Sequence, residues 1–86
     1  MKIGRTERFK KAFKQLDEKE RKSARKAIEN LAENMKYPSL RVKKIKGTEH
    51  IWEAWASQSL RMTFEITADT IILRNIGHHD EALKQP

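Results

Sequence analysis

The chain has 86 residues, enough for one small domain with a modest core, and we expect a single domain over residues 1–86. It carries 19 Lys and Arg against 12 Asp and Glu, a net charge of +7, and no cysteine, which disfavours the disulfide-stabilised secreted classes. The apolar runs are too short to span a membrane, and the N-terminus lacks the apolar segment of a signal peptide. We therefore expect a cytoplasmic protein.

The first third of the chain has the periodicity of helices. Thr6 is a suitable N-cap for a first helix, and Asp17 with Glu20 three residues later resembles the capping box of a second. Tyr37-Pro38 should end the second helix, because the residue before a proline disfavours helical angles. A helix hairpin over residues 6–36 is predicted. Its apolar residues share one side of each helix: Phe9, Ala12, Phe13 and Leu16, then Ala24, Ala27, Ile28, Leu31 and Met35.

From Leu40 onward, apolar and polar residues alternate with the period of strands. Residues 51–57, 60–66 and 71–76 fit this pattern, and Lys2-Ile3-Gly4 is a candidate for one more short strand. The alternation over 60–66 sends one set of side chains toward the helices and the other set away: Leu60, Met62, Phe64 and Ile66, against Arg61, Thr63 and Glu65.

These patterns predict an α+β fold in which an N-terminal two-helix hairpin packs on one face of a small antiparallel sheet built from residues 40–76. The other face of the sheet is expected to be open and polar. Of Trp52 and Trp55, one should face the core and the other the opposite face. The side chains expected to be largely buried are Phe9, Phe13, Leu16, Ile28, Leu31, Leu60, Met62, Phe64 and Ile72.

The positive charge lies on the helical half and on a short run that follows it. Residues 1–37 hold 12 Lys and Arg against 6 Asp and Glu, and the lysines of residues 8–26 are most simply a solubilising helix surface. The run from Arg41 to Lys46 differs, because four cations in six residues of a predicted strand repel one another. Such a run indicates a phosphate backbone or an acidic protein segment as partner.

Few residues can carry chemistry. Adjacent histidines on a strand point to opposite faces, so His78 and His79 cannot chelate one ion, and His50 is the only other histidine. We expect no metal site and no cofactor. A histidine can instead act as a general acid or base, and with nearby cations it can serve metal-free RNA cleavage. An exposed tryptophan on a basic face can stack on a nucleobase, although tryptophans more often face a core or a partner.

In their order along the chain, several motifs together resemble the RelE/ParE toxin superfamily: Leu40–Gly47, Ile51–Ala54, Leu60–Ile66, Asp69–Leu73 and Ile76–Asp80. The resemblance covers nearly the whole chain, and it implies the toxin of a type II toxin–antitoxin module with a cognate acidic antitoxin. RelE-like members enter the ribosomal A site and cut mRNA there without metal. ParE-like members poison DNA gyrase and are not nucleases.

The resemblance also implies roles for residues. Lys46, with Lys44 upstream, matches the cation of the Lys/Arg-Gly loop, and Arg61 matches a strand arginine that contacts the scissile phosphate. His79 matches the position that protonates the leaving group. The candidate base is Glu53, as the nearest carboxylate on the hairpin, or alternatively a lysine. The side chains left to bind RNA around these catalytic candidates are Arg41, Lys43, Trp55 and His78.

Two departures from the nuclease pattern keep alternatives open. Residues 52–57 contain no Lys or Arg, with Trp55 at one place where RelE-like nucleases carry a basic residue, and Asp80 stands where several have a tyrosine. The leading hypothesis is a ribosome-dependent endoribonuclease that cuts mRNA in the A site and inhibits translation. The alternatives are a non-enzymatic ParE-like gyrase inhibitor and a basic nucleic-acid-binding domain without toxicity.

Overall fold

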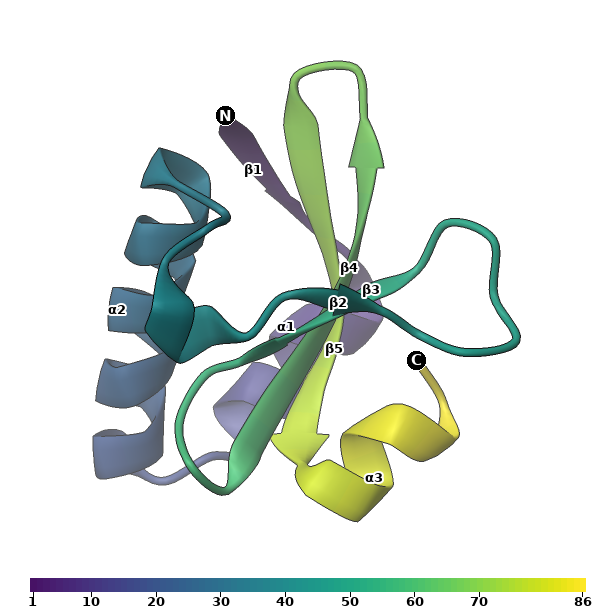
Figure 1. The fold of residues 1–86 in the computed structure, drawn as a ribbon. Helices are drawn as coiled ribbons and strands as arrows, with labels where there is room; N and C mark the ends of the chain where they lie inside the picture. Colours follow the sequence, from purple (N-terminus) through teal and green to yellow (C-terminus); the bar gives the residue numbers. More distant parts are fainter.

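A computed structural model describes all residues from Met1 to Pro86. The elements in chain order are β1 (Lys2–Arg5), α1 (Glu7–Lys14), α2 (Glu18–Glu33), the 3₁₀ turn η1 (Pro38–Leu40), β2 (Lys43–Lys44), β3 (Trp52–Trp55), β4 (Leu60–Thr67), β5 (Thr70–His78) and α3 (His79–Lys84). The five strands form one sheet in the order β1-β5-β4-β3-β2 (Figure 1). The predicted α+β class is confirmed, but the sheet is mixed, because β1 runs parallel to β5 while the other pairs are antiparallel.

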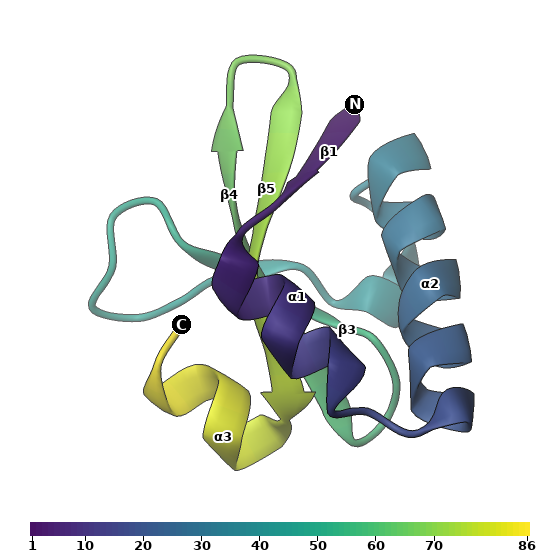
Figure 2. The ribbon, with the colours of Figure 1, turned by 180° about the vertical axis from the view of Figure 1, so that it is seen from behind.

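The helix hairpin forms as predicted, because its caps are encoded locally. The Thr6 hydroxyl accepts a hydrogen bond from the Phe9 amide at 3.1 Å. Asp17 and Glu20 make the reciprocal capping box, with distances of 2.8 and 3.0 Å. In Figure 2, α1 crosses the sheet in front of β5 and α2 stands beside it. Neither these two helices nor α3 is long and apolar enough to cross a membrane.

The core lies between the hairpin and the sheet. Most of the side chains predicted to be buried are buried, with Phe9, Leu31 and Phe64 at 1% exposure or less. Phe13 and Ile72 are only half-buried, which corrects the prediction for both. On β5 it is Ile71 and Leu73 that face the core, so Ile72, the residue between them, faces the other way. Ile66, in the β4–β5 hairpin that projects at the top of Figure 1, is 36% exposed.

The prediction that the second face of the sheet is open is wrong, because α3 and the residues that follow it pack there. The Thr63 hydroxyl donates to the Pro86 carbonyl at 3.0 Å, and the Asn75 amide donates to the Gln85 carbonyl at 3.1 Å. On this face Glu53, Arg61 and Thr63 are 4%, 6% and 0% exposed. The face is therefore a second, polar packing layer rather than a free surface.

The cationic run forms much less strand than its pattern predicted. Arg41 has a left-handed backbone (φ 46°) at the end of η1, and only Lys43–Lys44 pairs with β3. The chain then leaves the sheet in a loop over residues 45–51, which projects at the right of Figure 1. Gly47 turns this loop at φ 83°, a conformation that side-chain-bearing residues disfavour. The lysines therefore line a loop at the sheet edge.

A basic hollow and a stacked arginine pair as the candidate functional site

Residues from distant parts of the chain meet in a hollow of about 530 Å³ between β2, β3 and α3. Its chemistry-bearing side chains are five that the sequence singled out: Lys43, Lys44, Lys46, Glu53 and His79. Ile45 and Leu83 complete the wall. Helix α3, which the sequence did not predict, brings the histidine to the lysines.

Glu53 is the buried member of an ion pair in this hollow. Its carboxylate lies 3.3 Å from the Lys43 ammonium, and the side chains are 5% and 72% exposed, respectively. The register of β2 on β3 places these residues opposite each other. Because the exposed lysine is flexible and the carboxylate is fixed, Lys43 can leave Glu53 for a phosphate that enters the hollow. Glu53 is then free to accept a proton.

His79 is an accessible imidazole at the site. It is the first residue of α3, its side chain is 58% exposed, and its Nδ1 lies 3.2 Å from the Asp80 carboxylate. Its Nε2 has no partner in the protein. An imidazole held at one nitrogen by a carboxylate presents the other nitrogen to a ligand, which is the geometry required of a general acid.

Arg61 is placed differently from a free phosphate-binding arginine. Its Nη1 donates to the carbonyls of Ser57, Gln58 and Leu60, each at 3.0 Å. Burial lowers the pKa of Arg61, while nearby Glu53 raises it and Arg41 lowers it. The side chain therefore braces the turn between β3 and β4. Only Nε and Nη2 are without protein partners.

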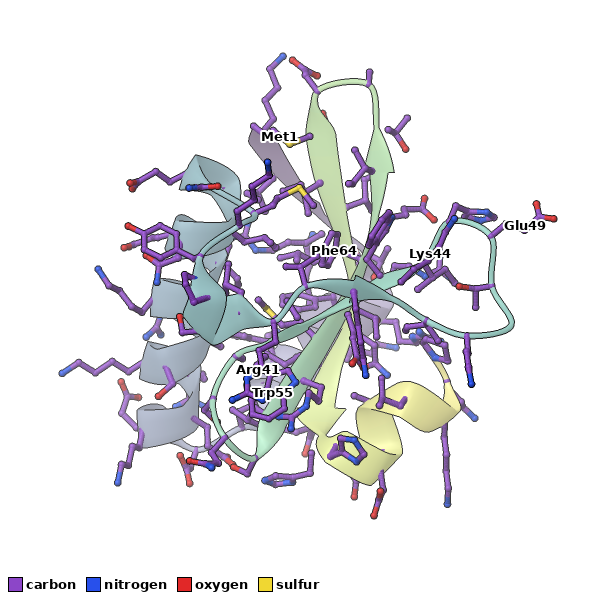
Figure 3. The ribbon with its side chains drawn as sticks, viewed as in Figure 1. Met1, Arg41, Lys44, Glu49, Trp55 and Phe64 are labelled. Carbon is purple, nitrogen blue, oxygen red and sulfur yellow. The ribbon has the colours of Figure 1, made fainter.

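The indole of Trp55 lies under two guanidinium groups. The Cζ of Arg61 is 3.6 Å from the ring centroid and that of Arg41 is 4.3 Å away. Figure 3 shows Arg41 and Trp55 next to each other, well apart from Lys44. Trp52 packs against the core instead, so the prediction that the two indoles take opposite faces is confirmed. Arg41 is the exposed end of this stack.

His78 lies apart from the other predicted site residues. Its Nε2 is 2.9 Å from the Glu20 carboxylate at the start of α2, on the helix side of the sheet. The two histidines thus diverge, as adjacent positions at a strand end must. The hollow contains only one of them, and His78 does not line it.

Sequence reasoning missed the residues that hold α3 in place. The Arg8 Nη2 donates to the carbonyls of Gln85 and Pro86 at 2.7 and 2.8 Å, and the Arg74 Nε donates to Pro86 at 3.1 Å. These contacts tie α1 and β5 to the segment that carries His79. No local pattern marks them, since Arg8 looks like an ordinary helix-surface residue.

No protein-family model matches the sequence, and no curated protein does. Solved structures are similar over nearly the full length. A chain of the RelB-RelE antitoxin-toxin complex from Methanococcus jannaschii matches with 24% sequence identity and a TM-score of 0.77. The match covers 96% of this chain and 99% of that one. A chain of the E. coli RelBE complex matches with 15% identity and a TM-score of 0.71, over 91% of this chain and 95% of that one. A YoeB/ParE toxin from Agrobacterium tumefaciens matches with 13% identity and a TM-score of 0.77, over 92% of this chain and 99% of that one.

These similar structures are toxins of toxin–antitoxin systems, two of them solved with their antitoxins. They share the order and arrangement of elements that the motifs of this chain indicated. The identities are low, so the likeness concerns the fold. The chain has the fold of the RelE/ParE toxin superfamily.

Proposed function

We propose that this protein is the toxin of a type II toxin–antitoxin module and cuts mRNA in the ribosomal A site. The observation that carries the proposal is the hollow in which His79 meets a buried carboxylate and three lysines. The toxin fold of the similar structures supports it. The hollow opens to solvent at its lysine rim, where a phosphate can enter.

The proposed reaction is transfer within the RNA chain. The ribose 2′-hydroxyl gives its proton to Glu53 and its oxygen attacks the neighbouring phosphorus, while the bond from phosphorus to the 5′-oxygen breaks. His79 protonates that leaving oxygen, and Lys44 and Lys46 neutralise the charge that grows on the phosphate. The products are a 2′,3′-cyclic phosphate and a 5′-hydroxyl end.

Arg61 receives a different role in this proposal from the direct phosphate contact that the resemblance implied. With Nη1 engaged by three carbonyls, it acts mainly by holding Trp55 and the β3–β4 turn in position. Its remaining donors add positive potential at the edge of the hollow. We therefore treat it as a positioning residue.

The ParE-like alternative has its own support. No Lys or Arg lies in residues 52–57, and the candidate base is paired with Lys43 in the absence of RNA. Primer extension on mRNA under translation, with gyrase supercoiling measured in parallel, separates the two. We expect breaks within codons only when ribosomes are translating. Intact mRNA with inhibited gyrase would establish the alternative, and neither effect would leave a nucleic-acid-binding domain.

The proposed antitoxin has a suitable surface in the groove between α1 and α2. This groove, of about 560 Å³, has an apolar floor that includes Phe13, whose ring is stacked 6.0 Å from that of Phe9. Its rim carries more cations than carboxylates: Arg5, Lys10, Lys11, Lys14 and Arg25 against Glu7 and Glu29. An acidic amphipathic helix fits both the floor and the rim.

Reversing charge on that rim should weaken the complex. We expect Lys11→Glu with Lys14→Glu to lower the affinity for an acidic protein encoded beside this one by at least about tenfold, through faster dissociation and slower association. The control is Lys36→Glu, an exposed residue outside the groove. Surface plasmon resonance at two salt concentrations measures both rates. Equal effects of the double variant and the control would place the antitoxin elsewhere.

A further inference from the structure

A second basic groove lies between α2 and the β3–β4 turn, and neither the proposed chemistry nor the antitoxin surface uses it. Its volume is about 760 Å³. Three lysines of one helix face, Lys19, Lys22 and Lys26, line one wall, and Arg41 with Trp55 lines the other. From the sequence alone these lysines are a solubilising surface, and the fold changes that interpretation by bringing the stacked arginine against them.

The cations of this groove have no acidic partners. All four are exposed, none forms an ion pair, and no Asp or Glu lines the groove. Lysines spaced three and four residues apart on a helix repel one another. The groove therefore carries concentrated, uncompensated positive charge, and a polyanion would relieve it.

The rest of the lining indicates which polyanion. The aliphatic groups beside the lysines are small or buried, namely Ala27, Ala56 and Leu40, so an amphipathic helix would find no apolar anchors. The polar groups are hydroxyls and amides, including Ser23 and Asn30, which suit phosphate and sugar oxygens. The only large flat surface is the outer face of the Arg41 guanidinium, which lies over the Trp55 indole, and this plane can stack a base.

The groove lies next to the hollow of the candidate site along β3. Trp55 and Glu53 are two residues apart on β3 and therefore share one face of the strand. Trp55 lines the groove, and Glu53 lines the hollow. Arg41 and Lys43 stand in the same relation along the cationic run. A strand bound in the hollow can therefore continue past Trp55 toward α2.

We propose that this groove binds a single-stranded RNA backbone flanking the position that is cut, with phosphates at the α2 lysines and a base on the Arg41–Trp55 stack. The inference rests on the proposed function for the assumption that the strand is mRNA. The binding of single-stranded RNA is argued from the groove alone. It assigns the α2 lysines to substrate positioning, outside the reacting atoms.

The test is binding of a labelled single-stranded RNA of about 12 nucleotides, a length within the range of small single-strand sites. Its riboses are 2′-O-methylated so that it cannot be cut. We expect Lys19→Ala, Lys22→Ala and Lys26→Ala together to reduce the affinity for RNA about 10²-fold in about 0.1 M salt. The slope of log K against log salt concentration should become shallower by about 2, because each phosphate contact contributes about 0.7 to it. Fluorescence anisotropy measures both quantities.

The control variant carries Lys2→Ala, Lys36→Ala and Lys84→Ala, which remove the same charge from exposed positions outside this groove, the hollow and the antitoxin surface. All six positions are exposed, so both variants should fold. A second readout uses Trp52→Phe, which leaves Trp55 as the only indole, and RNA bound against the Arg41–Trp55 stack should quench its fluorescence. Equal losses in the two triple variants, or an unquenched Trp55, would overturn the inference.

Other outcomes separate this inference from the proposed function. Binding that is lost in the α2 variant but not in the control, with no mRNA cleavage by the unaltered protein, would keep the groove and reject the nuclease. Cleavage with RNA affinity unchanged in the α2 variant would keep the nuclease and reject the groove. Loss of binding to an acidic helical peptide, with RNA binding intact, would assign the groove to a protein and reject the inference.

Discussion

Replacing Arg61 with alanine should lower the free energy of unfolding by about 2–4 kcal/mol, the range expected when a buried, charge-assisted hydrogen-bonding group is removed. The carbonyls of Ser57, Gln58 and Leu60 would lose the donor that they share, and Arg61 itself is only 6% exposed. The Trp55 ring would also lose the guanidinium 3.6 Å from its centroid. Urea denaturation should show a lower midpoint with an unchanged slope.

Arg21→Ala is the control for this prediction. Arg21 lies on α2 and pairs with Glu18 at 2.9 Å, and its side chain is 27% exposed, so its loss should cost about 1 kcal/mol. Unchanged stability in the Arg61 variant, together with lost cleavage, would return Arg61 to the phosphate-binding role that the resemblance implied. Relief of growth arrest in that variant is not by itself a sign of catalysis, because a destabilised protein is also degraded.

Replacing His79 with alanine should lower the rate of mRNA cleavage by about 10²-fold or more, the usual contribution of a positioned general acid. The reason is specific to the transition state, since the imidazole gives its proton to the departing 5′-oxygen. Stability should not change, because the side chain is 58% exposed and its one ion-pair partner is the adjacent Asp80. Quantitative primer extension on translated mRNA measures the rate, and thermal unfolding checks the fold.

His78→Ala provides a control of the same chemistry one residue earlier. That imidazole contacts Glu20 at the start of α2 and lies outside the hollow, so cleavage should stay within about threefold of the unaltered rate, far from the loss expected for a general acid. Equal losses from the two substitutions would show that the histidines act through the position of α3. Full activity without His79 would remove it from the mechanism.

The parts of the fold that the sequence predicts correctly depend on near neighbours. The Thr6 cap and the Asp17–Glu20 box join residues three apart, so the pattern contains the whole interaction. The inward face of β4 follows from strict alternation around Met62. Register and face orientation therefore emerge from a short window of sequence.

The parts that it predicts wrongly depend on contacts between distant residues. Helix α3 has only six residues, too few for a periodic signal, and it is held by Arg8 from the other end of the chain. Alternation alone places Arg61 on the face away from the hairpin, and it gives no sign that the C-terminal segment will cover that face. The sequence predicts the lysines, Glu53 and His79 as site residues. It does not predict α3, which brings His79 to the lysines and forms one wall of the hollow.

The parallel pairing of β1 with β5 has a consequence for the time course of folding. Lys2 pairs with Thr70 and Arg5 with Leu73, so β1 receives its partner only after β5 has emerged from the ribosome. Contacts between residues so distant in sequence close slowly and late. During synthesis the hairpin of α1 and α2 can form early, but its apolar side stays uncovered until β5 arrives. The nascent chain therefore completes its sheet in a single late step, and a chain interrupted before β5 has no sheet on which β1 can dock.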